Sequence, residues 1–130
     1  MHVIPDLIRK ISEGKTLKLI NGGNQERAFV HVSDVASALI LMMESKKANE
    51  EIFNIASNDQ YQILELAKMI WELLKKGEAF YFESIELKND DLMKSLADAS
   101  KINKLLKWKL KKTLKQSLPE MVKWYSRKYA

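Results

Sequence analysis

The stretch ERAFVHVSDVASALILMME, residues 26–44, combines a charged start, a short alternating run and a long apolar run. The alternation in AFVHV (28–32) predicts a short strand, and the apolar run at helical spacing predicts a helix after it. Ser33 or Asp34 can cap that helix by accepting a free backbone N–H. We expect its buried face to consist of five apolar residues: Val35, Ala36, Leu39, Ile40 and Met43.

On both sides of this stretch, helices and strands alternate. Helical spacing recurs in 3–14, 61–76 and 100–107, and strand patterns recur in TLKLI (16–20), EIFNIAS (51–57) and AFYFESI (79–85). Between them, NGGN (21–24) predicts a turn, and ELKNDDLMKS (86–95) predicts a polar loop. The whole pattern predicts one α/β domain over residues 1–130, with about five helices and about four short strands.

The last helix has two candidate capping boxes, Thr113 with Gln116 and Ser117 with Glu120. A helix starting at Thr113 would contain Pro119, which lacks an N–H and crowds the preceding turn. A start near Ser117 would put that proline harmlessly in the first turn. We therefore expect a turn over 113–116 and a helix from about 117.

Composition excludes several classes of protein. The chain has no cysteine, which excludes disulfide scaffolds, thiolate zinc sites and cysteine nucleophiles, and is compatible with a reducing, cytoplasmic setting. No apolar run approaches the roughly 20 residues that cross a bilayer. Proline and charges near the start do not fit a signal peptide. We expect a cytoplasmic protein without a membrane contact.

The residues offer no complete catalytic or metal site. The Gly22–Gly23 pair leads into a predicted strand rather than a helix, so it is not a dinucleotide fingerprint. No tyrosine is followed by lysine four residues later. His2 and His31 are far apart in the sequence, and His31 is interpreted as a hydrogen-bonded structural residue on a strand. We assign no catalytic, metal or cofactor-binding residue to the chain.

Four segments in order resemble the extended short-chain dehydrogenases/reductases, the NAD-dependent sugar-nucleotide epimerases and dehydratases. The opening stretch is similar to their Arg-Asp-Phe-Val-Tyr/His-Val-x-Asp segment, preceded by a similar helix, strand and turn. EIFNIAS followed by ILELAKMI resembles their Phe-Asn-Ile-Gly and Glu-Leu-Ala stretch. ADASKINKLLKW and the final VKWY resemble the family's ending.

The resemblance covers only the family's small C-terminal, substrate-binding part. It implies that the NAD-binding Rossmann domain is missing, so that this chain is an excised domain, a truncated product or a fragment. A complete enzyme would use NAD(P), and this part alone would not be catalytically competent. The face that packs on the Rossmann domain in the family would be an uncovered apolar patch here, which self-association could hide.

The resemblance also implies four substrate-binding residues for a nucleotide sugar. Arg27 matches an arginine near the diphosphate or ribose, where a guanidinium can grip phosphate oxygens bidentately. Lys18 aligns with a position bordering the nucleobase, and Asn54 with an asparagine near the substrate. Lys94 is the nearest cation to a position where relatives have an arginine, but a lysine does not reproduce its planar fork.

The alternative is a non-enzymatic binding module. Lys101 to Lys115 holds seven lysines and no acid, which permits contact with nucleic acid or another anionic partner. However, the aromatic residues occupy predicted core positions instead of alternating with the lysines as stacking platforms. A solvated helix face is therefore the favoured interpretation, and nucleic acid is an unlikely partner.

Overall fold

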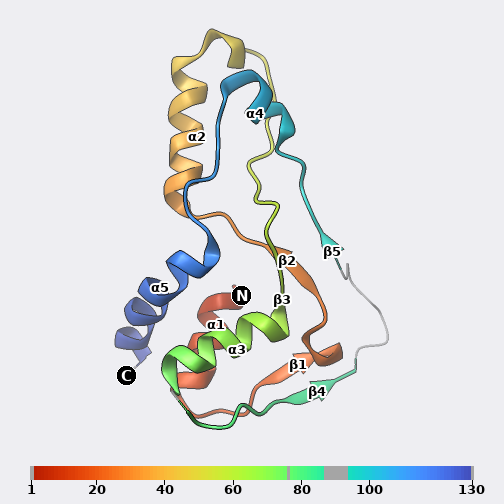
Figure 1. Cartoon of the computed structure of the whole chain (residues 1–130), viewed down its shortest axis with the longest axis vertical. Helices are drawn as coiled ribbons and strands as arrows, with labels where there is room; N and C mark the ends of the chain where they lie inside the picture. The colour runs from red at the N-terminus through yellow and green to blue at the C-terminus, as the bar shows by residue number, and fades with distance from the viewer. Residues whose placement is uncertain (1, 76, 87–93, 130) are drawn as a thin grey trace. The chain divides into compact units, whose positions relative to one another are not determined.

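The computed structural model describes residues 2–75, 77–86 and 94–129. In this part, the helices are α1 (Val3–Ser12), α2 (Val32–Glu44), α3 (Ile63–Leu74), α4 (Ser100–Leu106) and α5 (Leu114–Tyr129). The strands are β1 (Lys18–Ile20), β2 (Glu26–Ala28), β3 (Gln60–Gln62), β4 (Glu83–Ile85) and β5 (Lys94–Ser95), with 3-10 turns η1 (Asn21–Gly23) and η2 (Lys46–Ala48) (Figure 1). The predicted α/β fold is confirmed, with one more short strand than expected.

The chain divides into two compact units. The first comprises Met1–Arg27, Tyr61–Lys94 and Leu118–Ala130, and the second comprises Ala28–Gln60 and Ser95–Ser117. One sheet pairs β1 with β4, and a three-stranded sheet has the order β3-β2-β5.

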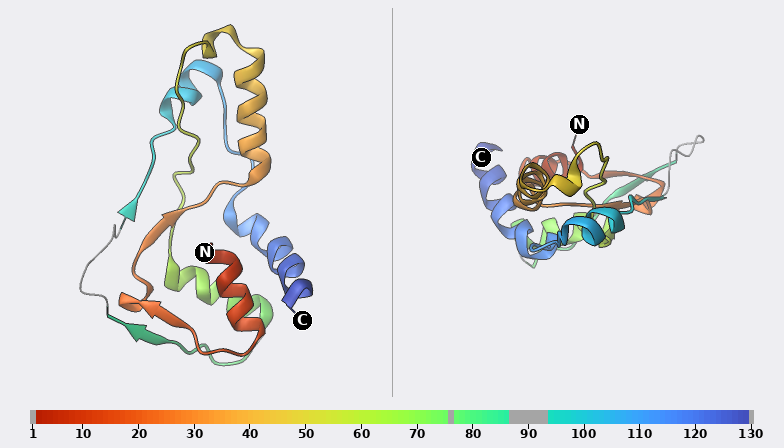
Figure 2. Two further views of the ribbon diagram at one scale, coloured as in Figure 1. Left: turned by 180° about the vertical axis from the view of Figure 1, so that it is seen from behind. Right: turned by 90° about the horizontal axis from the view of Figure 1, so that it is seen from above.

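In the first unit, helices α1 and α3 pack on each other through their apolar faces. Their fully buried side chains include Ile8, Ile11, Leu66 and Ile70. Strands β1 and β4 run parallel with Leu19 opposite Ser84, and Figure 2 shows them side by side from behind. The i, i+3, i+4 spacing of apolar residues in α1 explains why this short helix is stable here, since burial of each such side chain contributes about 1.5–3 kcal/mol.

In the second unit, a smaller core forms around α2 and α4. Ala38, Ile102, Leu106 and Trp108 are its buried members. The indole Nε1 of Trp108 donates to the backbone oxygen of Asp34 at 3.1 Å, which satisfies the polar edge of the buried ring. This contact joins the first turn of α2 to the chain after α4.

The start of α2 differs from the prediction. The strand is Glu26–Ala28 rather than 28–32, and the helix begins at Val32. His31 is the N-cap, and its Nδ1 accepts from the backbone N–H of Ser33 at 3.2 Å. Ser33 and Asp34 lie inside the helix, so the prediction that one of them caps it was wrong.

The buried face of α2 also differs from the prediction. Leu39, Ile40 and Met43 are 50%, 54% and 87% exposed, whereas Asp34 and Ala38 are buried. Helix α2 is apolar around most of its circumference, so periodicity could not select the face that packs. The small Ala38 side chain allows close approach to Trp108 and α4, and that contact sets the orientation.

Residues 51–57, predicted as a covered strand, form no strand among the described residues. Phe53 and Ile55 nevertheless pack against the second unit's core. An apolar run of strand length predicts burial, but a strand also needs a neighbouring backbone to complete its ladder. Elsewhere, only Glu83–Ile85 of the 79–85 run is a strand, and residues 87–93 of the predicted polar loop lie outside the described part.

Helix α5 begins at Leu114, earlier than predicted. Gln116 Oε1 accepts from the Thr113 backbone N–H at 3.0 Å, and Thr113 Oγ1 accepts from the Gln116 N–H at 3.3 Å. This reciprocal capping box stabilises the early start despite Pro119 inside the helix. The carbonyl that Pro119 leaves without a helical donor belongs to Lys115, an exposed residue.

Candidate functional site

A pocket of about 260 Å³ lies entirely within the first unit. Its apolar lining comes from α1, β1 and the start of α3, through Val3, Leu7, Leu17, Leu19, Ile20 and Ile63. Its polar lining comes from His2, Asp6, Lys10, Lys18, Gln25 and Arg27. A mainly apolar cavity with a few convergent polar groups is the usual form of a small-molecule site.

Arg27, which the resemblance implies is a substrate-binding residue, lines this pocket. It lies on β2, and its Nη1 donates to the backbone oxygen of Glu26 at 2.8 Å. Nη2 donates to Gln25 Oε1 at 3.3 Å. These contacts hold a half-buried guanidinium, whose five donors suit bidentate contact with phosphate oxygens.

Lys18 lines the same pocket from β1. Its Nζ lies 3.8 Å from Glu83 Oε2, and both side chains are about 60% exposed, at 60% and 61%. An exposed pair at this distance contributes little to stability. Its ammonium can therefore exchange this contact for a ligand at small cost.

The pocket also contains two charged residues of α1 that the sequence did not single out. Lys10 Nζ lies 2.7 Å from Asp6 Oδ2, and Arg9 Nη2 donates to Asp6 Oδ1 at 2.7 Å. Burial alone would raise the pKa of Asp6, but the hydrogen bonds and charges of Lys10 and Arg9 outweigh it and lower the pKa. The carboxylate therefore stays ionised. The sequence does show an Asp and a Lys four residues apart, but this spacing occurs on many solvated helices and does not by itself indicate a binding site.

Asn54 is not among the residues that line this pocket. Asn54 lies in the second unit, where its Nδ2 donates to the backbone oxygen of Asp98 at 3.2 Å. Lys94 forms part of β5, and its side chain lies outside the described part of the structure. The structure thus brings Lys18 and Arg27 together.

The glycine pair after β1 does not fit a dinucleotide. Gly22 and Gly23 adopt φ values of 69° and 78° in a 3-10 turn that leads into β2. A Cβ on Gly23 would lie 2.8 Å from the backbone nitrogen of Leu64, so this glycine permits close packing on α3. Among the described residues, no glycine-rich turn joins a strand to a helix, and NAD does not fit the side chains available here.

In the part of the chain that the structure describes, no group of three or more His, Asp or Glu side chains could hold a metal ion. No helix in this part is long and apolar enough to cross a membrane.

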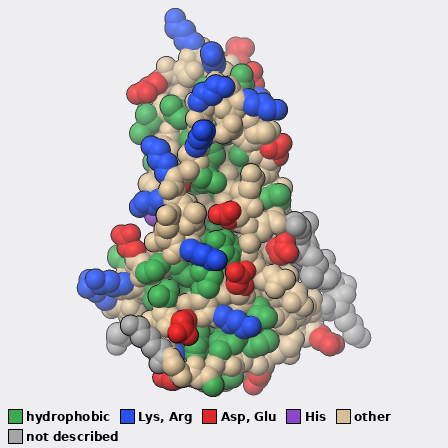
Figure 3. Space-filling model, viewed as in Figure 1, with side chains coloured by type: hydrophobic (Ala, Val, Ile, Leu, Met, Phe, Trp, Pro, Cys, Tyr) green, Lys and Arg blue, Asp and Glu red, His purple; other side chains and the backbone are tan. Residues whose placement is uncertain are grey.

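Each lysine in the stretch from Lys101 to Lys115 is exposed. Lys101 Nζ pairs with Glu51 at 2.6 Å and lies 5.4 Å from the centre of the Phe53 ring. Figure 3 shows basic side chains interspersed with acidic and apolar ones on the face in view.

Comparison with known proteins shows what the chain is similar to. The model of the NAD dependent epimerase/dehydratase family matches residues 1–56. A probable GDP-L-fucose synthase from Oryza sativa subsp. japonica is 34% identical over 129 residues, covering 95% of this chain and 38% of the relative. The chain thus spans well under half the length of that relative.

Solved structures show the same similarity. A dTDP-glucose 4,6-dehydratase from Bacillus anthracis, in complex with NAD, is 28% identical with a TM-score of 0.80 over 97% of this chain and 39% of its own. The UDP-glucose 4-epimerase of Thermotoga maritima, with UDP-glucose, has a TM-score of 0.85 over 99% of this chain and 40% of its own. Its 23% identity supports the fold alone.

Proposed function

Because this chain is related in sequence and fold to the NAD-dependent epimerases/dehydratases, extended short-chain dehydrogenases/reductases, we propose that it is the nucleotide-sugar-binding part of such an enzyme. The observation that carries the proposal is the pocket that Lys18 and Arg27 line together. Arg27 contacts the diphosphate through its planar fork. Lys18 borders the nucleotide from β1.

Asn54 and Lys94 belong to the proposal on the resemblance alone. Asn54 would contact the substrate when its amide exchanges the Asp98 carbonyl for a ligand acceptor. Lys94 would supply a point charge in place of an arginine. Both assignments can fail while the pocket assignment stands, because the pocket assignment rests on Lys18 and Arg27.

The complete enzyme would use NAD(P) to oxidise a hydroxyl of the sugar by hydride transfer. The described residues of this chain do not fit that cofactor. Their proposed role is to bind and orient the nucleotide sugar. We infer that a pure sample of these 130 residues has no epimerase, dehydratase or reductase turnover.

The apolar face of α2, formed by Leu39, Ile40 and Met43, supports a second part of the proposal. These side chains are exposed within the described structure, although burial of similar side chains normally stabilises a protein. We propose that a Rossmann-type domain covers this face in the complete enzyme, and that the isolated chain self-associates through it.

The non-enzymatic alternative is not favoured. The relatives are named as nucleotide-sugar enzymes, and the lysine stretch includes Lys101 in an ion pair with Glu51.

Titration of the ¹⁵N-labelled chain with UDP-glucose and dTDP-glucose tests the pocket, because NMR shifts detect millimolar binding and locate it. We expect shifts at Lys18, Arg27 and their neighbours. Arg27→Ala should weaken binding by about 1.5–3 kcal/mol, the range for a hydrogen bond to a charged group, and Arg27→Lys should recover part of the loss. Equal affinity of Arg27→Ala and the parent would disprove the role of Arg27.

A further inference from the structure

Gln25 lines the first unit's pocket directly before β2, two residues from Arg27. Side chains two residues apart on an extended chain point to the same side, and the contact between Gln25 and Arg27 follows this rule. The backbone oxygen of Gln25 accepts from the N–H of Ile63 at 3.0 Å, which ties the residue to the start of α3. The half-buried Gln25 is thus held at the pocket by its backbone and by its side chain.

The contact with Arg27 determines which end of the Gln25 amide remains available to a ligand. Arg27 Nη2 donates to Gln25 Oε1 at 3.3 Å. A guanidinium has donors only, so it selects the amide oxygen and leaves the two N–H donors of Nε2 for another partner. Among the described residues, none accepts a hydrogen bond from Gln25 Nε2. The pocket lining therefore offers a neutral donor group beside a charged one.

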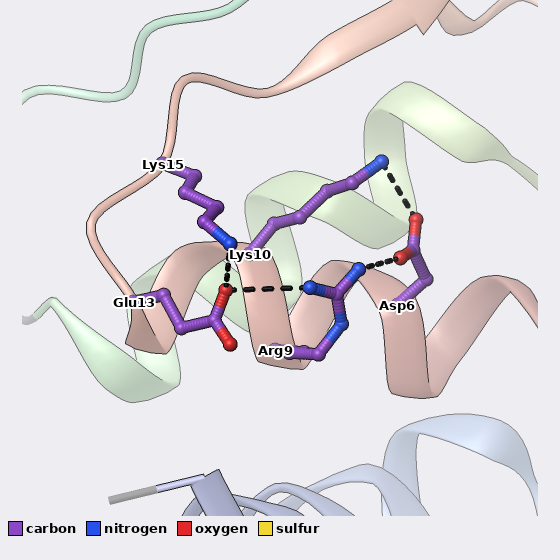
Figure 4. Close-up of polar contacts among 5 residues, drawn as sticks. All are labelled: Asp6, Arg9, Lys10, Glu13 and Lys15. Carbon is purple, nitrogen blue, oxygen red and sulfur yellow. Dashed lines mark hydrogen bonds and ion pairs between the residues drawn. The ribbon is translucent and has the colours of Figure 1, made fainter.

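The charges around the pocket select an anionic group for these donors. Three cations line it, from Lys10, Lys18 and Arg27. Asp6 is the single acid among the described lining residues. Figure 4 shows its carboxylate already paired with Lys10 and Arg9, each at 2.7 Å. The lining is therefore net positive and attracts phosphate, whose oxygens accept hydrogen bonds from neutral and charged donors alike.

We propose that Gln25 is a phosphate-binding residue, whose Nε2 donates to a phosphoryl oxygen of the diphosphate that Arg27 contacts. Arg27 orients the amide by holding Oε1, and the amide places a second donor group next to the planar fork. Two donor groups from different side chains fix the direction from which the phosphoryl group is held. This inference rests on the proposed function, since it adds a residue to the site of the same diphosphate.

The direct test follows the side-chain amide signals of glutamine during titration of the ¹⁵N-labelled 130-residue chain. We expect UDP and inorganic pyrophosphate to shift the Gln25 Nε2–H signals, because a hydrogen bond to a phosphoryl oxygen changes their environment. Uridine, which lacks phosphate, should leave them unchanged at the same concentration. Gln62 is the matched control, since it is exposed, belongs to the same unit and does not line the pocket.

Substitutions measure the contribution of this contact to affinity. Gln25→Met keeps a side chain of similar length but removes the amide, and it should weaken UDP binding by about threefold to tenfold, the range for one neutral hydrogen-bond donor. The same loss should persist in the Arg27→Lys background, because lysine also donates to Oε1 and the phosphate contact of Nε2 does not need the guanidinium. Gln62→Met should bind UDP like the parent. If Gln25→Met does not fold, the amide signals of the parent decide.

Each measurement can overturn the assignment. Gln25 amide signals that stay in place while Arg27 responds to UDP, or equal affinity of Gln25→Met and the parent, would overturn the role of Gln25 alone. A loss that disappears in the Arg27→Lys background would mean that Gln25 only positions Arg27, and the phosphate contact would be wrong. If no part of the chain responds to UDP at millimolar concentration, the proposed function fails as well.

Discussion

Replacing Asp34 by alanine should destabilise the second unit more than any surface substitution on α2. The Asp34 side chain is 1% exposed. Its Oδ2 accepts from the backbone N–H of Lys111 at 3.2 Å and of Lys112 at 3.0 Å, and Oδ1 accepts from Lys111 at 3.2 Å. Asp34 thus joins the first turn of α2 to the chain before α5.

The magnitude follows from these contacts. Two backbone donors to a carboxylate contribute about 1.5–3 kcal/mol each. The distances are at the long end, and Lys111 and Lys112 are exposed, so that water can replace part of the loss. We therefore expect Asp34→Ala to lower the free energy of unfolding by about 3 kcal/mol. Asp34→Asn, which keeps one acceptor oxygen, should lose about half as much.

Urea unfolding followed by circular dichroism gives the free energy, and amide hydrogen exchange gives a local readout. The N–H groups of Lys111 and Lys112 should lose protection in Asp34→Ala. Glu44→Ala, an exposed acid in the last turn of the same helix, is the matched control and should stay within about 0.5 kcal/mol of the parent. A loss below about 1 kcal/mol in Asp34→Ala, with protection at Lys112 unchanged, would refute the reasoning.

Three further predictions concern pH, capping and association. The pKa of Asp6 is lowered in the folded chain, so its ion pairs should stabilise the protein at pH values above the ordinary pKa of 3.8, and this contribution should be lost as pH falls through the lower folded pKa. In urea unfolding between pH 2 and 7, the free energy of unfolding should therefore fall less steeply with decreasing pH in Asp6→Asn than in the parent. Thr113→Ala should cost about 1 kcal/mol through loss of the α5 cap, measurable in the same assay against exposed Thr16→Ala as control. Met43→Glu should weaken self-association in sedimentation experiments without lowering stability, since Met43 is 87% exposed; unchanged association would exclude this face.

The sequence alone determined the elements with strong local signals. Helices α1, α3 and α4 were predictable because their apolar residues repeat on one face, and the NGGN turn because glycine tolerates positive φ. The order and spacing of four segments also showed the resemblance to the epimerases/dehydratases, and the four substrate-binding assignments that the resemblance implies remain predictions. These features depend on neighbours in the chain, which a sequence displays directly.

Only the tertiary structure decided which of several equivalent local options is used. Helix α2 has apolar residues around most of its surface, and packing of Ala38 on Trp108 selected the face that is buried. Thr113 and Ser117 were both plausible caps, and the observed box with Gln116 selected the former. Asp6 and Lys10 line the same pocket as Arg27 because folding places α1 and β1 around it. Such contacts join residues distant in sequence, and no local pattern records them.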